Sequence, residues 1–307
     1  MIKFIVNPNA GGEKGFSTWK ICERRLQKLN IPYKVYITDG PGDATRLAKR
    51  ATEAGEAVTI VPVGGDGTFN EVLNGINISD NVTVGYIPTG SGNDLARGLG
   101  FSGDPEKALD VILERKEIVK LDYGVLTYGG DHKTERRFAV SMGIGYDAAT
   151  CVAIDGSSMR RRLSKLNMQK AVYLTLGAIQ IFKSRPSGGY IIADDGDRTD
   201  INDVMFISSQ IHVTEGGGKP FTPGADPQDG LLSVCVMCGK SKPAFIKTLY
   251  KGINGIHQKD KNVMLLDCKS IKIHLDEASY VHTDGEVLGS MTDVEVHCVP
   301  DALNMIV

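Results

Sequence analysis

Strand-like and helix-like segments alternate through the first third of the chain, and this alternation constrains the fold more than any other feature. Apolar, strand-like runs occur at Ile2–Val6, Tyr33–Ile37, Ala57–Val63 and Val82–Pro88. The third run is almost wholly apolar and β-branched, as expected of a central parallel strand that is covered on both faces. Helix-like segments separate the runs. This order predicts an α/β domain with a doubly wound parallel sheet and right-handed crossovers.

Polar residues mark where the helices of this first part are expected to begin. Ser17 or Thr18 can cap the first helix, and Asp43 can cap the second. Asp104 and Pro105 suit the cap and first-turn positions of a later helix. These signals predict one helix after each of the strands that they follow.

The pattern changes after about residue 120, where short alternating runs replace the regular strand–helix order. The runs are 118–126, 137–142, 190–193, 204–208, 231–238, 270–275, 280–283 and 293–299. They predict a mostly antiparallel β-sandwich or barrel with inserted helices near residues 163–182 and 243–252. We therefore expect an α/β domain at residues 1–120 and a β-rich domain at 121–307. The last few residues are free to return to the first domain.

Composition narrows the classes of partner. The 307 residues carry a formal net charge of −2, so a nucleic-acid partner is not expected without a local basic patch. The six cysteines are scattered and no leader pattern precedes them, which favours reduced thiols in the cytoplasm. The longest apolar run, residues 171–182, falls short of the ~20 residues that span a bilayer. The protein is expected to be soluble, or at most to rest on a membrane.

Three glycine-rich loops leave the carboxyl ends of predicted parallel strands. They are Asn7-Pro8-Asn9-Ala10-Gly11-Gly12, Gly64-Gly65-Asp66-Gly67-Thr68 and Pro88-Thr89-Gly90-Ser91-Gly92-Asn93-Asp94. Ligands bind at this edge of open α/β sheets, and glycine lets backbone amides approach a phosphate. Any single loop is equally well explained as a turn, but three together favour a phosphate site.

Neither standard phosphate-binding signature accounts for these loops. The chain has no G-x-x-x-x-G-K-[ST], and no G-x-G-x-x-G follows a predicted strand. Asp66 and Asp94 stand inside the two best candidate loops, where a carboxylate repels a triphosphate unless a cation screens it. A divalent metal ion is the natural inference. The competing interpretation is that Asp94 caps the next helix and Asp66 fills a turn.

The second and third loops, read with their flanks, resemble the signature motifs of the diacylglycerol kinase catalytic domain family. The motifs are Gly64-Gly65-Asp66-Gly67-Thr68-Phe69-Asn70-Glu71-Val72 and Pro88-Thr89-Gly90-Ser91-Gly92-Asn93-Asp94-Leu95-Ala96-Arg97. Further matches are Asn7-Pro8-x-Ala10-Gly11, Gly143-Ile144-Gly145-Tyr146-Asp147-Ala148, Ala225-Asp226-Pro227-x-Asp229-Gly230 and Asp284-Gly285-Glu286. The resemblance covers nearly the whole chain.

The resemblance implies a kinase that transfers the γ-phosphoryl group of ATP to a lipid hydroxyl, with Mg²⁺ bound. By motif, Glu286 is the proton acceptor and Asp284 lies beside it. The nucleotide-binding residues implied are Asn7, Pro8, Asn9, Ala10, Gly11, Thr38, Gly65, Asp66, Gly67, Thr68, Phe69, Asn70, Glu71, Ser91 and Asp94. A magnesium ion that steadies the site is implied at Asp229, with backbone carbonyls of Asp226 and Leu231.

The chemistry of the residues agrees with this transfer. Phosphoryl transfer needs in-line placement, charge neutralisation and an acceptor for the hydroxyl proton. In an extended segment Asp284 and Glu286 point the same way and can flank one hydroxyl and a metal. Without the family pattern, Asp284-Gly285 is better interpreted as an ordinary hairpin turn.

The leading hypothesis is an ATP- and Mg²⁺-dependent lipid kinase acting on diacylglycerol or a related lipid alcohol. The alternatives are an NAD kinase-like phosphotransferase, which shares the Gly-Gly-Asp-Gly-Thr loop, and a non-catalytic nucleotide-sensing protein. The sequence does not identify the acceptor lipid, and a homodimer is compatible with it. The basic segment with Arg160, Arg161, Arg162, Lys165 and Lys170 precedes the apolar stretch 171–182. It suits either transient contact with the inner face of a membrane or a solvated helix face.

Overall fold

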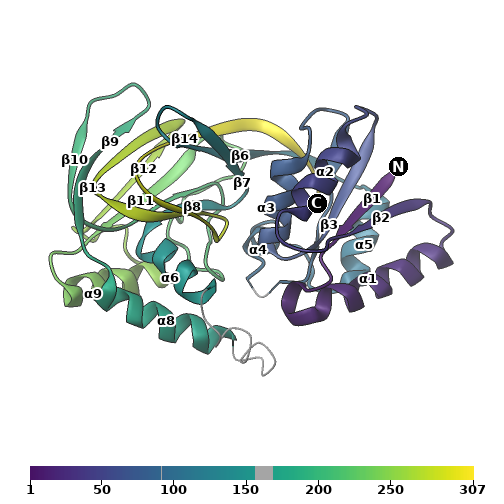
Figure 1. The fold of residues 1–307 in the computed structure, drawn as a ribbon, viewed down its shortest axis with the longest axis horizontal. Coiled ribbons are helices and arrows are strands. Elements are labelled where there is room, and N and C mark those ends of the chain that lie inside the picture. Colours follow the sequence, from purple (N-terminus) through teal and green to yellow (C-terminus); the bar gives the residue numbers. More distant parts are fainter. Residues whose placement is uncertain (91, 156–168) are drawn as a thin grey trace. The chain divides into compact units, whose positions relative to one another are not determined.

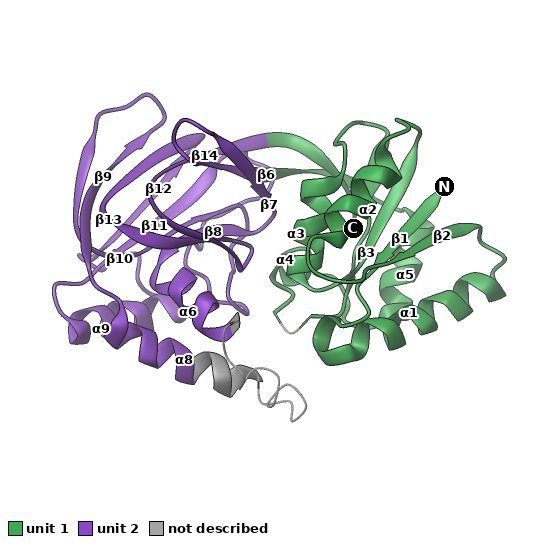
Figure 2. Cartoon of the chain, viewed as in Figure 1, with its two compact units in different colours: residues 1–123, 300–307 green, residues 124–299 purple. Residues whose placement is uncertain are grey.

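The computed structural model describes residues 1–90, 92–155 and 169–307, with side chains left undescribed for 155 and 169–174. The described chain divides into two compact units (Figure 2). Unit 1 contains Met1–Tyr123 and Pro300–Val307, and unit 2 contains Gly124–Val299. The chain therefore leaves unit 1 once and returns to it at its carboxyl end.

Unit 1 is built on a parallel sheet (Figure 1). Its strands are β1 (Ile2–Val6), β2 (Tyr33–Ile37), β3 (Val58–Gly64), β4 (Val82–Val84) and β5 (Ile87–Pro88). The strand order is β4-β3-β1-β2, and β5 extends the pairing along β3. The end of β14 (Glu286–Ile306) adds a further parallel strand, with Asn304 opposite Thr83 of β4. All seven residues of β3 are buried, as its apolar sequence predicts.

Helices cover the sheet of unit 1. They are α1 (Ala10–Lys28), α2 (Asp43–Thr52), α3 (Asp66–Gly75), α4 (Asp94–Gly98) and α5 (Pro105–Glu114). Helices α1 and α5 share a core, in which Trp19 and Leu109 pack against Phe4 and Val63. Helices α2 and α3 pack against each other. The chain moves outward from β1 to β2 and back from β2 to β3, so right-handed crossovers place α1 and α2 on opposite faces. The doubly wound α/β prediction is confirmed.

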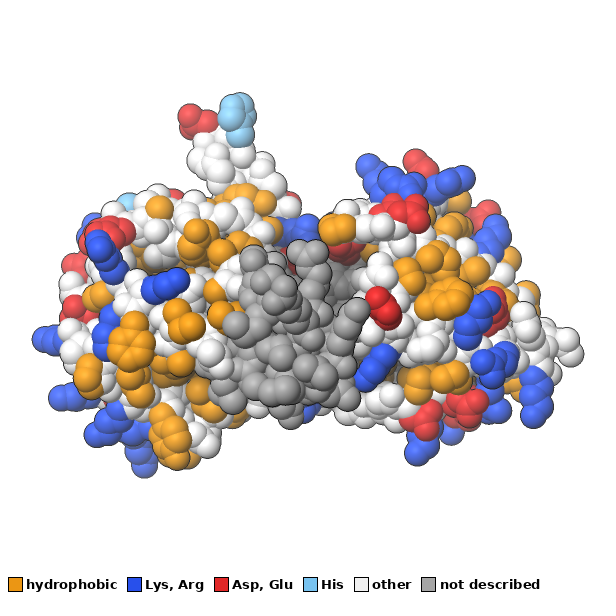
Figure 3. Space-filling view, turned by 60° about the horizontal axis from the view of Figure 1, so that its bottom comes forward, with side chains coloured by type: hydrophobic (Ala, Val, Ile, Leu, Met, Phe, Trp, Pro, Cys, Tyr) orange, Lys and Arg blue, Asp and Glu red, His pale blue; other side chains and the backbone are white. Residues whose placement is uncertain are grey.

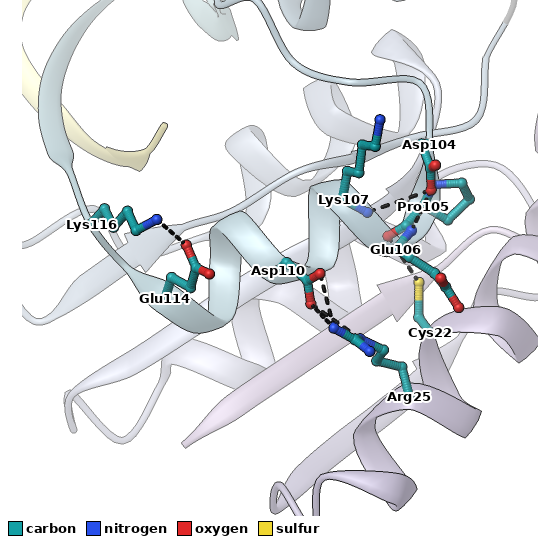
Figure 4. Close-up of polar contacts among 9 residues, drawn as sticks. All are labelled: Cys22, Arg25, Asp104, Pro105, Glu106, Lys107, Asp110, Glu114 and Lys116. Carbon is teal, nitrogen blue, oxygen red and sulfur yellow. Dashed lines mark hydrogen bonds and ion pairs between the residues drawn. The ribbon is translucent and has the colours of Figure 1, made fainter.

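Polar contacts cap the start of α5 and join its middle to α1 (Figure 4). Asp104 caps α5 by accepting the Glu106 amide at 2.9 Å, and Pro105 occupies its first turn, as predicted. Both oxygens of Asp110 accept from the Arg25 guanidinium, at 2.9 and 3.0 Å. This bidentate pair links the two helices at the edge of their shared apolar core.

The first helix begins earlier than its sequence suggests, so the predicted cap at Ser17 or Thr18 is wrong. Asn9 is the N-cap residue, and the next turn is irregular because Gly11, Gly12 and Glu13 all have positive φ. The Ser17 hydroxyl donates to the Lys14 carbonyl, within the helix. The glycine-rich loop and the first turn of α1 are therefore one structural segment.

Unit 2 is β-rich and mostly antiparallel, which confirms the predicted fold class of the second half. Its strands are the second part of β6 (Ile118–Tyr128), β7 (Thr134–Phe138), β8 (Ser141–Gly145), β9 (Ser187–Ala193), β10 (Thr199–Gln210), β11 (Leu232–Cys238), β12 (Val263–Cys268), β13 (Ser270–Thr283) and the first part of β14. The order is β12-β11-β10-β8-β13-β14, and β9 pairs with both β10 and β13. This double pairing gives the sheet a barrel-like closure around an apolar core.

Helices α6 (Tyr146–Asp155), α8 (Gln169–Lys183) and α9 (Lys242–Ile253) accompany this sheet. One predicted strand, residues 137–142, is wrong as a single element. It spans the end of β7 and the start of β8, with a break at Ala139 and Val140. The break arises because those amides turn away from the ladder toward the Asp284 carboxylate.

Most of the basic segment that precedes residues 171–182 falls outside the part of the chain that the structure describes. Arg160, Arg161, Arg162 and Lys165 lie outside the described residues, as does the side chain of Lys170. Within the described ranges, none of the helices is both long and apolar enough to cross a bilayer.

Candidate active site

The loops after β1 and β3 meet where the strand order of unit 1 reverses. Strands β1 and β3 are neighbours, but the chain leaves them toward opposite edges of the sheet. Such a switch point is the usual ligand site of an open α/β sheet. The Asn7 amide donates to the Thr68 hydroxyl at 3.0 Å and joins the two loops. The parallel sheet thus brings together residues that are far apart in the sequence.

The third loop lies against the other two at glycine positions. A Cβ on Gly11 would lie 1.9 Å from the Thr89 carbonyl oxygen, and φ at Gly11 is +62°. A Cβ on Gly90 would lie 2.7 Å from the Gly65 Cα. Backbone therefore contacts backbone, and no larger residue fits at these points. The convergence of the three loops that the sequence predicts is present.

The Asp66 carboxylate bridges the second and third loops. It accepts the amides of Asp94, at 3.1 Å, and of Leu95, at 3.4 Å, which are the first two residues of α4. A carboxylate at a helix N-terminus compensates unpaired amides and the helix dipole. The interpretation of Asp94 as the cap of its own helix is wrong, because Asn93 holds that position without a side-chain cap bond.

Two residues that sequence reasoning left unassigned also belong to this region. Of the described residues, Thr89 and Asn93 have buried side-chain oxygens, Oγ1 and Oδ1, with no hydrogen-bond partner. The Asn93 amide nitrogen donates to the Gly90 carbonyl at 3.0 Å, which fixes the direction of Oδ1. Unpaired buried polar atoms are uncommon and call for a partner. A hydroxyl and an amide oxygen beside glycine amides suit a phosphate and its associated cation.

The remaining residues of the implied nucleotide set differ in what they can contact. Phe69 and Asn70 are buried, and the Phe69 ring packs on Tyr86 at 5.2 Å, so their side chains serve the core. Glu71 caps α2 by accepting the Gly42 and Ala44 amides at 2.9 and 3.1 Å. Thr38 is buried, at the end of β2. Ser91 lies outside the described residues.

Pro8, Asn9, Ala10 and Gly67 line these loops through their backbone. The Phe16 amide donates to Pro8, and the Asn9 amide donates to the Asn7 side chain. Ala10 opens α1, and Gly67 lies in the first turn of α3. The usable donors of unit 1 are therefore mainly backbone amides and the hydroxyls of Thr68 and Thr89, while the Asn93 Oδ1 is an acceptor.

In unit 2, the Asp284-Gly285 pair forms the two-residue turn that joins β13 to β14. Both residues have positive φ, +49° and +85°, as a type I′ turn requires. Thr283 pairs with Glu286 directly below the turn. The expectation of an extended segment is therefore wrong, because the left-handed turn directs Asp284 and Glu286 differently.

The Asp284 carboxylate is engaged with backbone. It accepts the amides of Ala139 and Val140 at 2.9 Å and of Ser141 at 3.0 Å. The Asp284 amide in turn donates to the Ser141 carbonyl at 2.8 Å. These bonds anchor the turn to the segment between β7 and β8. Asp284 is thus a positioning residue, while Glu286, which follows the turn, is exposed.

A buried polar cluster lies beneath this turn, and only the structure brings it together. His282 Nε2 lies 2.8 Å from the Asp147 carboxylate, and the Gly285 amide donates to His282 Nδ1 at 3.1 Å. The ring proton is therefore on Nε2. A Cβ on Gly143 would lie 1.8 Å from the Asp147 Oδ2, which explains the glycine in this motif. The cluster connects α6 to the turn that carries Glu286.

Burial and neighbouring charges set the pKa values in this cluster. Burial, and next the Asp147 carboxylate, raise the pKa of Glu215 to about 7, although Ser208 donates to it at 2.8 Å. Burial lowers the pKa of His282, but the carboxylates of Asp147, Glu215 and Asp284 outweigh it and raise the pKa overall. Unit 2 therefore holds a buried carboxyl group, Glu215, whose pKa is about 7, beside a histidine whose pKa is raised.

The residues implied for magnesium lie in the connection between β10 and β11. Asp226 and Asp229 are exposed, and the Asp229 amide donates weakly to the Asp226 carbonyl, at 3.5 Å. In the described part of the chain, no group of three or more His, Cys, Asp and Glu side chains is arranged to hold a metal. One carboxylate and the backbone carbonyls of Asp226 and Leu231 are still oxygen donors of the kind Mg²⁺ prefers, with water completing the shell.

Unit 2 also contains a cavity of about 300 Å³ beside α6, α8 and β13. Its lining includes Tyr146, Gln180, Lys183, Arg185 and Glu277. These polar and charged groups suit a polar ligand better than an apolar one.

Comparison with known proteins agrees with the order of these two units. Residues 1–126 match the model of the diacylglycerol kinase catalytic domain. Residues 140–307 match the model of the YegS C-terminal NAD kinase beta sandwich-like domain. The Bacillus subtilis protein YtlR, which carries a lipid-kinase name, is 28% identical over 299 residues, covering 94% of this chain and 93% of its own. The Bacillus subtilis diacylglycerol kinase is 26% identical over 297 residues, covering 94% and 90%.

The fold has solved counterparts. The crystal structure of a diacylglycerol kinase from Bacillus anthracis aligns with a TM-score of 0.69 at 21% identity, covering 99% of this chain and 96% of that one. At this identity the likeness concerns the fold. The two matched domains together account for nearly all of the chain. The chain therefore belongs to the diacylglycerol kinase family of lipid kinases.

Proposed function

We propose that this kinase transfers the γ-phosphoryl group of ATP to the hydroxyl of diacylglycerol or a related lipid alcohol, and that it depends on Mg²⁺. One observation carries the nucleotide part of the proposal. Three glycine-rich loops converge at the switch point of unit 1, with unpaired buried oxygens on Thr89 and Asn93. A site made of backbone amides suits phosphates, because an amide adds partial positive charge and needs little room.

Glu286 is the proposed general base. The lipid hydroxyl attacks the γ-phosphorus, its proton passes to the Glu286 carboxylate, and ADP leaves as the bond from its β-phosphate oxygen breaks. Carboxylate side chains commonly act as general bases toward a hydroxyl proton. Asp284 holds the turn through three amides and so limits where Glu286 can go. A protein catalyses phosphoryl transfer largely by holding the reacting groups in fixed positions.

Asp229 and the backbone carbonyls of Asp226 and Leu231 are the proposed ligands of one magnesium ion. When bound, this ion supplies positive charge that steadies the loop between β10 and β11. The Asp229 carboxylate already accepts the Leu231 amide at 2.9 Å, so the loop is compact before an ion binds.

The test is to incubate the purified protein with γ-labelled ATP, Mg²⁺ and a panel of acceptors, and to resolve the labelled products. The panel contains diacylglycerol, phosphatidylglycerol, a sphingoid base, ceramide, undecaprenol and NAD. We expect label in a lipid product and its loss when EDTA is added. Label in NAD phosphate would replace the lipid proposal with the dinucleotide one. ATP binding without any labelled product would indicate a nucleotide sensor.

A further inference from the structure

Helices α8 and α9 each expose an apolar stripe on unit 2. On α8, Ile179 and Phe182 are 43% and 71% exposed and border a shallow depression with Thr175 and Ala178. On α9, Ile246, Tyr250 and Ile253 recur at helical spacing and are 40%, 65% and 38% exposed. We call these five side chains, Ile179, Phe182, Ile246, Tyr250 and Ile253, the α8–α9 face.

These stripes are additional to the apolar surface that the helices need for folding. The inward side of α8 supplies Ile181, and the inward side of α9 supplies Phe245 and Leu249, to a separate buried cluster. The two helices also contact each other. An ordinary surface helix has one apolar stripe and a polar opposite side. A second, exposed stripe on both of two adjacent helices indicates a surface that binds something.

The charged residues of the two segments that carry the α8–α9 face are all basic, and Asp260, which pairs with Lys251, follows directly after the second segment. Residues 175–185 and 240–259 contain no Asp or Glu, although the chain as a whole has a net charge of −2. The basic residues in these segments are Lys183, Arg185, Lys240, Lys242, Lys247, Lys251 and Lys259. Lys251 pairs with Asp260 at 2.7 Å, and Lys242 donates to the Ser184 carbonyl. Lys183, Arg185, Lys240 and Lys247 are exposed.

Figure 3, which views the molecule from the side of α8 and α9, shows hydrophobic side chains spread over this part of unit 2. Lys and Arg side chains lie between and around them in the same view. Exposed apolar side chains with a cationic border are the features of an interfacial membrane-binding surface.

We propose that the α8–α9 face docks on the surface of an anionic lipid bilayer. Tyr250 and Phe182 would enter the headgroup region, and the exposed lysines would contact the anionic headgroups. A second copy of this chain is disfavoured as the occupant, because a symmetric contact would place two basic borders against each other. The docking site itself is argued from exposure and charge. Only its role, which is to bring the enzyme to a substrate that stays in the bilayer, rests on the proposed lipid kinase function.

The test is sedimentation of the full-length protein with vesicles of two compositions, pure phosphatidylcholine and an equimolar mixture with phosphatidylglycerol. We expect binding to the mixed vesicles that falls steeply as salt rises, because screening shortens the reach of surface charges. Phe182→Ser combined with Tyr250→Ser should weaken binding by about tenfold or more, given the apolar area removed. Lys240→Glu combined with Lys247→Glu should weaken it by at least about fivefold per site.

Matched controls use residues of the same kinds elsewhere. Ile118, 45% exposed, is replaced by Ser, and the exposed Lys49 by Glu, and both variants should bind as the wild type does. The proposal is overturned if the wild type binds both vesicle types equally at all salt concentrations. It is also overturned if the Phe182 and Tyr250 variant binds normally, or if light scattering shows that this variant only dissociates a dimer.

A kinase assay separates failure of this proposal from failure of the proposed function. The Phe182 and Tyr250 variant should phosphorylate a water-soluble short-chain diacylglycerol as the wild type does, but lose activity on diacylglycerol embedded in anionic vesicles. Equal loss on both acceptors would overturn the docking role. Absence of lipid phosphorylation by the wild type, with vesicle binding intact, would instead contradict the assigned acceptor.

Discussion

In unit 1 and in unit 2, one aspartate carboxylate links separate chain segments by accepting hydrogen bonds from backbone amides. The amides lie in different kinds of structure in the two units. Asp66 accepts two amides at the start of α4, whereas Asp284 accepts three amides at a break between two strands. In unit 1 the helix dipole adds to the effect, and in unit 2 the number of bonds is larger. In both units, the acidic residue of a signature motif organises the loop that presents other groups.

This comparison distinguishes two kinds of residue within the signature motifs: those with polar atoms still able to bind a ligand, and those whose carboxylates hold the backbone in place. Thr89 and Asn93 in unit 1 have oxygens with unmet hydrogen-bonding capacity, and Glu286 in unit 2 is exposed. Asp66 and Asp284, by contrast, are engaged by amides. In the proposed function the first group contacts substrates, and the second group holds the loops that carry the first.

The largest expected effect is on catalysis, from Glu286→Gln. Glutamine keeps the size of the side chain but cannot accept the hydroxyl proton, so kcat should fall by roughly 10² to 10⁴ with little change in the KM for ATP. Initial rates and the melting temperature are measured together. A folded Glu286→Gln enzyme with wild-type kcat would remove Glu286 from the role of base.

The second prediction tests the comparison directly by removing each organising carboxylate. Asp284→Ala should lower the free energy of unfolding by about 2 to 4 kcal/mol, because it leaves three partly buried amides without a hydrogen-bond acceptor. Asp66→Ala should have a smaller effect, about 1 to 2 kcal/mol, because α4 is short and its end can be solvated. Urea unfolding measures both. A larger loss from Asp66→Ala would reverse the order of importance argued above.

A pair of neighbouring glycines sharpens the argument for unit 1. Gly11 and Gly12 both have positive φ, +62° and +74°, but only a Cβ on Gly11 would collide with the Thr89 carbonyl. Gly12→Ala should therefore cost about 1 kcal/mol from backbone strain alone. Gly11→Ala should cost roughly 1 to 3 kcal/mol more and should weaken ATP binding. Calorimetric unfolding and ATP titration of the two variants check this, and equal effects would rule out close loop contact.

The smallest effect concerns the pH dependence of stability in unit 2. The pKa of Glu215 is about 7 in the folded chain against 4.5 as its ordinary value, so the folded state keeps a proton that the unfolded state has lost. Stability from this group is complete below pH 4.5 and is lost as the pH rises through about 7. The raised pKa of His282 has the same sign and acts above its ordinary 6.5.

The matched variant is Glu215→Gln, which keeps the hydrogen bond from Ser208 but does not titrate. The groups facing Glu215 are Ser141, Ser208, Asp147 and His282. Unfolding free energy is measured between pH 4 and pH 8 for the variant and the wild type. A slope unchanged by Glu215→Gln would show that another group titrates in that range.

Short-range patterns account for what could be predicted. The strands at residues 2–6 and 33–37 and the cap at Asp104 follow from apolar periodicity and local turn chemistry, which act over a few residues. The sequence also predicts a turn at Asp284-Gly285, because this dipeptide favours the positive φ angles of a type I′ turn. The Ser17 cap is wrong because the chain kinks at Gly11, Gly12 and Glu13 and the regular turns of α1 begin directly after this kink, before Ser17.

The sequence by itself determined the two fold classes, the three phosphate-type loops and the family of the chain, because each is written in neighbouring residues. Only the tertiary structure decided what the motif side chains contact. Asp284 meets Ala139 across 145 positions and His282 meets Asp147 across 135, and the burial that pairs them depends on how distant strands pack. Side-chain partners at such separation are set by strand register and close packing, which no local pattern encodes.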